Sequence, residues 1–198
     1  EWLEREQGAE AVWIPVSEFG VVDLGWLETF LSERASDVAL ISLMWANNET
    51  GVITPIDQVT ELAKRFDIPV HSDAVAALGH IKLSFATSGL AAMSITAHKV
   101  GGPVGVGALV VARSAKLTSL VHGGGQERAM RSGTMNAAGA KAFALAVSLA
   151  AANLEQHALH TSELRDQVIH GVMKLVPDAR FSRGEAPGLP DNAHFTFP

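Results

Sequence analysis

Short apolar runs that alternate with longer segments of helical periodicity constrain the fold of this 198-residue chain more than any other feature. Residues 38–44 form an apolar run rich in branched side chains, and they lie between a helical pattern that Asp23 can cap and another at 55–66. Further runs of strand length occur at 68–71, 91–96 and 105–112. Strands that alternate with helices predict an α/β fold with a mostly parallel sheet.

The two ends of the chain follow the same patterns. They predict a helix end at 2–8, a short strand at 11–16 and a long helical segment at 137–176 with a break near Asn153. The stretch RGEAPGLPDN is rich in turn formers, and HFTFP after it alternates like a strand. We therefore expect the chain to begin and end in mid-structure.

Composition and charge exclude several classes of function. The net charge of -6 is spread along the chain, and no run of Lys and Arg could follow the phosphates of nucleic acid. The absence of cysteine excludes disulfides and thiolate metal sites, and His157 and His160 are too few ligands for zinc. Residues 1–10 lack the apolar core of a signal peptide, and no apolar run is long enough to span a membrane. We expect a soluble, cytoplasmic protein that binds neither nucleic acid nor membranes.

The stretch SITAHKVGGPVGVGALVV, residues 94–111, is the most informative part of the sequence. A strand that looks buried leads through His98 and Lys99 into a glycine-rich turn, and a second strand follows at once. Because lysine is rarely buried without a partner, Lys99 is a candidate for an amine with a depressed pKa, suited to Schiff-base formation. The alternative is that this long side chain simply reaches solvent.

Polar residues also follow two other predicted strands, at the carboxyl ends where α/β sheets bind ligands. Asp73 comes after 68–71, and its carboxylate suits either a protonated pyridinium nitrogen or the N-terminus of a helix. Asn47 and Asn48 come after 38–44 and suit either a turn or hydrogen bonds to a ligand. The sequence alone does not choose between these interpretations.

HGGGQERAMRSGT, residues 122–134, combines three glycines with exposed backbone amides and the forked cations of Arg128 and Arg131. This combination predicts anion binding, with a flexible surface loop as the alternative. An esterase oxyanion loop is excluded because the chain has no GxSxG motif. The run GGPVGVG is not a dinucleotide fingerprint, because a strand and not a helix follows it.

Four motifs, ANNETG, HSDA, AHK with GPxGxGAL, and GGGQERxxRSGT, occur in an order that resembles the NifS and IscS-like cysteine desulfurases and selenocysteine lyase. The resemblance is dense over 38–139 and looser beyond it. It implies the class V aminotransferase fold, which is fold type I of the pyridoxal phosphate (PLP) dependent transferases. It also implies a partial PLP-binding large domain at 1–150, then a linking helix and the start of a small C-terminal domain at 151–198.

The resemblance further implies a role for each matching residue. Lys99 would be the lysine that holds PLP, and Asp73 would pair with the pyridine nitrogen of the cofactor. Asn48 would contact the ring hydroxyl side and the substrate. Thr96 and His98 would bind the phosphate of the cofactor.

Thr134 would complete the phosphate site of a neighbouring subunit, so the resemblance implies a homodimer. The implied activity of the whole protein is removal of sulfur from L-cysteine, which gives L-alanine and a persulfide for transfer to an acceptor protein, as in iron–sulfur cluster assembly. The catalytic cysteine of the family would lie beyond Pro198. The alternatives are a lyase acting on L-selenocysteine or another carbon–sulfur lyase and, from a different class, a non-catalytic dimerisation or scaffold domain.

Three positions depart from the usual pattern of that family. Ala76 stands where a glutamine normally hydrogen-bonds the ring oxygen of PLP, and Gly101 and Val104 replace a tyrosine and a lysine. One lost hydrogen bond is worth about 1 to 3 kcal/mol, which changes the colour of a bound cofactor without abolishing its binding.

Overall fold

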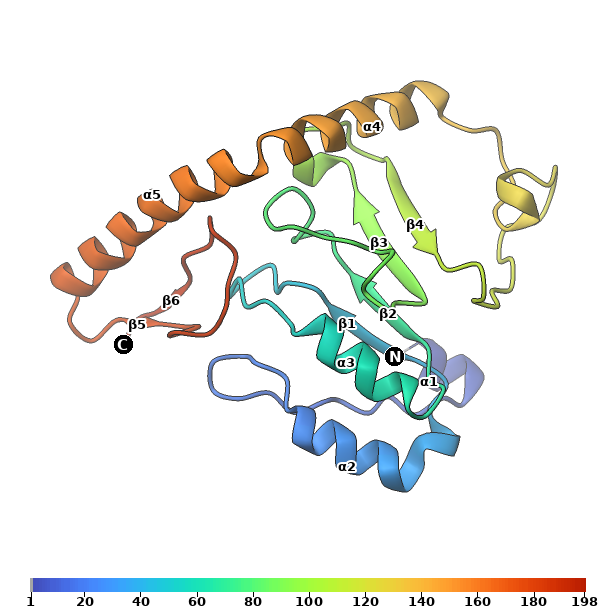
Figure 1. Cartoon of the computed structure of the whole chain (residues 1–198), viewed down its shortest axis with the longest axis horizontal. Coiled ribbons are helices and arrows are strands. Elements are labelled where there is room, and N and C mark those ends of the chain that lie inside the picture. Colours follow the sequence, from blue (N-terminus) through green and yellow to red (C-terminus); the bar gives the residue numbers. More distant parts are fainter. Residues whose placement is uncertain (1) are drawn as a thin grey trace.

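The computed structural model describes residues 2–198, and its centre is a four-stranded sheet (Figure 1). The strands, in spatial order, are β1 Ile41–Met44, β2 Val70–Asp73, β3 Ala92–Thr96 and β4 Gly107–Val111. β1, β2 and β3 run parallel, whereas β4 is antiparallel to β3. The predicted α/β fold is therefore confirmed. β4 reverses direction because the turn before it is too short for the crossover that a parallel neighbour needs.

The helices are α1 Trp2–Gln7, α2 Leu24–Arg34, α3 Ile56–Lys64, α4 Ala137–Ala152 and α5 Leu154–Leu175, and the short strands β5 Arg180–Phe181 and β6 Phe195–Thr196 form an antiparallel pair. α2 begins at its predicted cap, since Oδ1 of Asp23 accepts a hydrogen bond of 2.8 Å from the backbone N–H of Trp26. The break between α4 and α5 falls at Asn153 as predicted, with a bend of 69°.

The strand predicted at 11–16 is wrong. In this segment only Val16 pairs, through an isolated bridge to Val22, and Trp13 is 86% exposed. A β-branched, apolar run forms a strand only where a neighbour takes up its backbone hydrogen bonds, and no strand of the sheet lies beside this one.

The apolar core lies between one face of the sheet and the helices α2 and α3. Its buried side chains include Ile41, Val70 and Met93 from the strands, Leu27 and Leu31 from α2, and Val59 and Leu62 from α3. On α3 these residues recur at spacings of three and four, which gathers them on one side of the helix. This packing fixes where the carboxyl ends of the three parallel strands lie.

The opposite face of the sheet carries a row of polar side chains across three strands. Oγ of Ser42 lies 2.9 Å from Nδ1 of His71, and Nε2 of the same ring lies 2.9 Å from Oγ of Ser94. Asp73 lies on this face too, because it follows His71 by two residues in β2. The polar row therefore leads toward the strand ends where the predicted site residues are placed.

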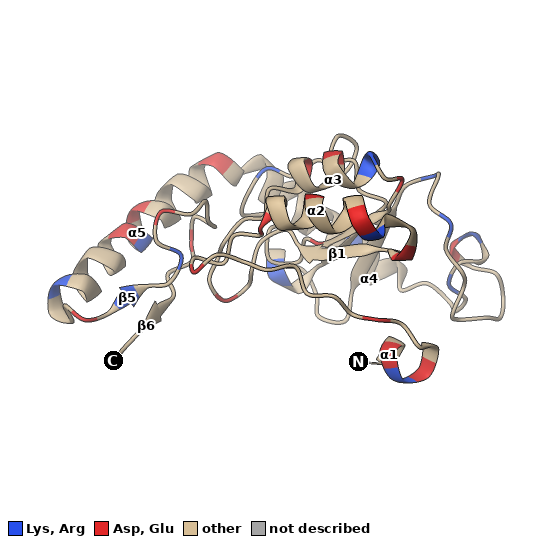
Figure 2. Cartoon of the chain, turned by 90° about the horizontal axis from the view of Figure 1, so that it is seen from below, with Lys and Arg blue, Asp and Glu red and all other residues tan. Residues whose placement is uncertain are grey.

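Charged side chains of both signs are distributed over α2, α3 and α5 (Figure 2). Within residues 2–198, no single helix is long and apolar enough to cross a membrane, and α4 and α5 meet that criterion only when they are taken together across their bend. The predicted domain boundary at 150 falls inside α4, and the division into a large and a small domain stays a prediction.

Candidate active site

Asp73 is the last residue of β2, so the strand is longer at this end than the 68–71 predicted from the sequence. Its backbone carbonyl accepts a hydrogen bond of 2.8 Å from Trp45, which ties it to the end of β1. Its Oδ1 accepts one of 2.9 Å from the N–H of Val75, within a turn and not at the start of a helix. No hydrogen bond to Oδ2 occurs among the described residues. One carboxylate oxygen is thus left for a ligand.

Lys99 lies in a short 3₁₀ turn, His98–Val100, that follows β3 directly. Oγ1 of Thr96 lies 3.0 Å from Nδ1 of His98, and the same hydroxyl donates a hydrogen bond of 3.2 Å to the carbonyl of Val106. Gly101 ends the turn with φ of 79°, a left-handed conformation that glycine adopts without steric cost. The glycine after Lys99 therefore allows the chain to reverse into β4.

Of the two interpretations of Lys99, the structure agrees with the one in which its side chain reaches solvent. The side chains of His98 and Lys99 are both exposed, although β3 begins with the buried Ala92 and Met93. The exposure begins only at His98, since Ala97 between β3 and the turn is fully buried.

The sequence left open whether the two asparagines after β1 form a turn or bind a ligand, and the structure separates them. Oδ1 of Asn47 accepts hydrogen bonds of 2.9 Å each from the N–H groups of Glu49 and Thr50, so Asn47 builds the turn. The side chain of Asn48 is exposed and makes no hydrogen bond to any residue from 2 to 198. Of the two, Asn48 is therefore the residue available to a ligand.

The fold places Asn48, Asp73 and Lys99 at one edge of the sheet, beyond the carboxyl ends of three adjacent strands. β1 and β2 pair in register at Met44 and Asp73, and Asp73 pairs in turn with Ser94 of β3. Thr96 and His98 lie at the same edge, since they flank the end of β3. Open α/β sheets bind their ligands at such an edge.

Thr134 lies elsewhere, in a segment that we call the arm, residues 113–136, which leads from β4 to α4 and extends away from the sheet (Figure 1). Thr134 is exposed, and the structure does not bring it to Asp73 and Lys99 of the same chain. The predicted anion-binding loop is part of the arm. One of its amides is used internally, since the N–H of Gly125 donates to Oγ of Ser132 at 3.2 Å.

Sequence reasoning missed an ion pair beside the lysine turn. Nδ1 of His80 lies 3.0 Å from Oδ2 of Asp191, which belongs to the turn-rich stretch near the end of the chain. Hydrogen bonding to Asp191 raises the pKa of His80 despite partial burial, and the same contact lowers the pKa of Asp191. The only signal in the sequence was a histidine after a glycine and an acid after a proline, which is too common a pattern to pair them.

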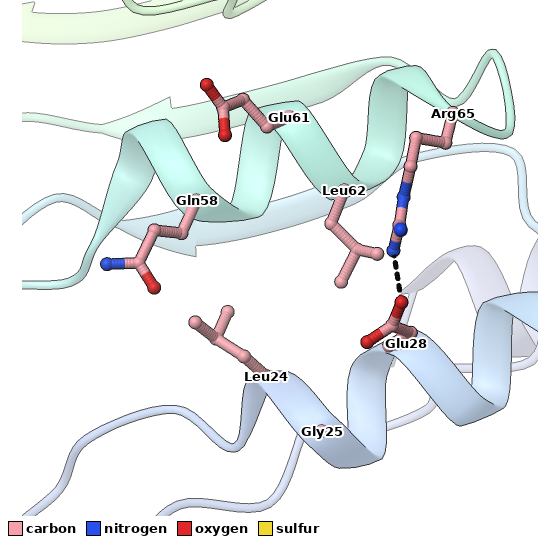
Figure 3. Close-up of a pocket in the computed structure, with 7 residues that line it drawn as sticks. All are labelled: Leu24, Gly25, Glu28, Gln58, Glu61, Leu62 and Arg65. Atoms are coloured by element: carbon pink, nitrogen blue, oxygen red, sulfur yellow. Dashed lines mark hydrogen bonds and ion pairs between the residues drawn. The ribbon is translucent and has the colours of Figure 1, made fainter.

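Two hollows of the described surface lie away from this edge. One, of about 390 Å³, lies between α2 and α3 and is lined by Leu24, Gly25, Glu28, Gln58, Glu61, Leu62 and Arg65 (Figure 3). Across it runs the exposed ion pair of Glu28 and Arg65, a type of contact that contributes little to stability. The other, of about 760 Å³, adjoins Pro69 and Ala91, at the amino ends of β2 and β3. Neither is part of the candidate site.

Residues 1–197 match the family model described as aminotransferase class-V. Over 197 residues the chain is 44% identical to the IscS-like cysteine desulfurase of Mycobacterium tuberculosis, which covers 99% of this chain and 50% of that protein. It is 40% identical to the cysteine desulfurase IscS of Dictyoglomus turgidum, over 96% of this chain and 48% of the relative. The chain thus spans about half the length of the curated relatives it matches.

Solved structures of similar sequence share the fold. A NifS-like protein superposes with a TM-score of 0.91 at 36% identity, over 98% of this chain and 52% of the other. The NifS-like protein of Rickettsia africae superposes with a TM-score of 0.87 at 31% identity, over 93% of this chain and 51% of the other. The predicted fold type is therefore confirmed.

Proposed function

The chain belongs to the aminotransferase class-V family, and from that membership we propose that the protein containing it is a PLP-dependent cysteine desulfurase. Its substrate would be L-cysteine and its products L-alanine and a persulfide, whose sulfur passes to an acceptor protein. The observation that carries the proposal is the single sheet edge where Asn48, Asp73 and Lys99 lie together. The names of the similar proteins support it.

The groups at this edge fit PLP. Oδ2 of Asp73 has no hydrogen-bond partner among residues 2–198, and a carboxylate there suits a protonated pyridine nitrogen. The hydroxyl of Thr96 and the ring of His98, 3.0 Å apart, suit the phosphate. Lys99 presents an exposed primary amine from the turn between them. When bound, PLP would supply an electron sink for the substrate carbon.

The residues of this chain would orient the bound cofactor and substrate and transfer protons to and from them. Asp73 is held by its bond to Val75, so its second oxygen has a fixed direction from which to orient a ligand. Asn48 would donate its amide hydrogens to the substrate side of the site. Lys99 would accept a proton at Nζ and return it to a neighbouring atom, as a general base and acid. Ala76 is half-buried and offers no hydrogen bond to the site.

A second copy of the chain would complete the site. We propose a homodimer in which the exposed Thr134 of one arm reaches the phosphate of its neighbour, because the arm extends away from the sheet edge of its own chain (Figure 1). The sulfur step needs an attacking thiolate, and the 198 residues contain no cysteine. A cysteine elsewhere in the protein would supply it.

The test is borohydride reduction of the full-length protein with PLP, followed by peptide mapping. Reduction fixes the cofactor covalently to the amine that holds it. We expect the label on Lys99. Lys82 is the main rival and is exposed, so it serves as the internal control. Label on Lys82 or on any other lysine would refute the assignment.

A further inference from the structure

The turn at Gly79 and His80 packs directly against the turn that carries Lys99. A Cβ on Gly79 would lie 2.7 Å from Cγ1 of Val100 and 3.4 Å from Cβ of Ala150 in α4. His80 follows Gly79 in this turn, and Nδ1 of its ring lies 3.0 Å from Oδ2 of Asp191. The turn of Gly79 and His80 thus lies between the lysine turn and an acid from the far end of the chain.

The acid is itself anchored to the turn that carries Asn48. Asp191 belongs to the segment 187–192, which we call the strap. The N–H of Leu189 donates to the carbonyl of Gly51 at 2.8 Å, and the N–H of Ile53 donates to the carbonyl of Pro187 at 2.8 Å. The side chain of Asn192 donates to the carbonyl of Glu49 at 2.8 Å. The strap therefore has a fixed position relative to β1.

We propose that His80 is a positioning residue for Lys99, and that Asp191 holds its ring so that the lysine turn, the strap and the asparagine turn keep one relative placement. The consequence for the cofactor rests on the proposed function. The packing of the Gly79 and His80 turn against Val100 does not.

The contact with Asp191 favours the charged ring of His80, whereas the charge of Lys99 opposes it. The groups that face the ring of His80 are Asp191 on the strap, Lys99 on the 3₁₀ turn and His157 on α5, whose ring centroid lies 6.3 Å away. The raised pKa of His80 means that its stabilisation is complete below the unfolded pKa and is lost as the pH rises through the folded one. The lowered pKa of Asp191 means that its stabilisation is complete above its unfolded pKa and is lost as the pH falls through the folded one. The pair of His80 and Asp191 therefore stabilises the fold most from about pH 4 to about pH 6.5.

Amide hydrogen exchange in the full-length protein without PLP tests the positioning role. The N–H groups of Val100 and Gly102 both donate to the carbonyl of Ala97, so their exchange reports opening of the lysine turn. In His80→Ala this exchange should rise about tenfold, because the turn that packs against Val100 loses its polar contact with Asp191. His80→Gln, which keeps a donor, should restore most of the protection. His160→Gln, an exposed histidine of α5, is the matched control and should change nothing.

The wild-type protein offers a second measurement if His80→Ala does not fold. Exchange at histidine C2, read by mass spectrometry, gives the pKa of His80, which should fall in Asp191→Asn. Exchange at Val100 and Gly102, corrected for its intrinsic pH dependence, should rise in the wild type as the pH passes the pKa of His80. Unchanged protection of these two amides in both experiments would overturn the proposal.

Cofactor trapping separates this proposal from the proposed function. The yield of borohydride-fixed PLP at Lys99 should fall in His80→Ala and be unaffected in His160→Gln. If the wild type traps no PLP at all, the proposed function fails while the exchange result still decides the role of His80. If trapping is normal in every variant and the two amides stay protected, His80 has no positioning role.

Discussion

The sheet edge and the arm are built in opposite ways. At the edge, Asp73 and Lys99 are placed by paired strands whose other face is packed against α2 and α3. In the arm, Leu120 is 89% exposed, and residues 127–129 adopt φ values of 48°, 58° and 63°. None of these three is a glycine, and each left-handed residue costs about 1 to 2 kcal/mol. The edge is thus supported by packing within the chain, whereas the arm combines exposed apolar side chains with three left-handed residues.

The largest effect should come from the edge. In the full-length protein, Lys99→Ala should remove the yellow colour of bound PLP completely while the fold persists, because the side chain is exposed and leaves no cavity. Visible absorbance and circular dichroism measure the two outcomes. Lys82→Ala is the control, and a yellow Lys99→Ala protein would break the assignment of the edge.

The next prediction isolates the edge from the rest of the protein. The 198 residues alone, given PLP and L-cysteine without added thiol, should release no more alanine than cofactor alone. Sulfur leaves when a thiolate attacks it, and these residues include no cysteine. Alanine in excess of the protein present would show that the sulfur acceptor has been misplaced.

The arm should respond to charge near a two-fold axis. Arg131→Glu should weaken the dimer by about tenfold or more, because an isologous contact brings both new carboxylates close together. Lys116→Glu makes the same change of charge at another exposed arm position and should have a smaller effect. Sedimentation of the full-length protein measures both. A wild type that is monomeric at micromolar concentration would remove the arm from the proposed site.

The smallest effect should come from removing backbone strain in the arm. Ala129 has φ of 63°, and Ala129→Gly should stabilise the left-handed turn by about 1 kcal/mol, since glycine adopts this region freely. Local amide exchange across 125–133 would slow accordingly. A substitution of Ala140 by Gly in the exposed face of α4 should act in the opposite direction and serves as the control. Faster exchange in Ala129→Gly would mean that the turn is not strained.

Local patterns made much of this fold predictable. The cap at Asp23 and the break at Asn153 depend on residues directly beside the helices that begin or end there, and the structure has both. The strand at 11–16 failed because pairing depends on a neighbour that local sequence does not specify. The roles of the site residues stay predictions, although the fold does place five of them at one edge.

Two features of the site were beyond sequence reasoning for different physical reasons. The exposure of Lys99 depends on the path of the turn after β3, and the apolar pattern of a strand predicts burial only for residues within that strand. The pairing of His80 with Asp191 joins residues far apart in the chain, and it arises only after the strap lies along Gly51 and Ile53. Neither depends on a local propensity.

The polar row of Ser42, His71 and Ser94 has a consequence for how the sheet assembles. A slip of one residue moves every side chain of a strand to the other face. Such a slip of β2 would bury the imidazole among Ile41 and Met93 and break both of its serine contacts. An orphaned buried polar group costs about 1 to 3 kcal/mol, so misaligned strands would be selected against during folding. The polar row therefore favours the strand register in which Asp73 lies level with the ends of β1 and β3.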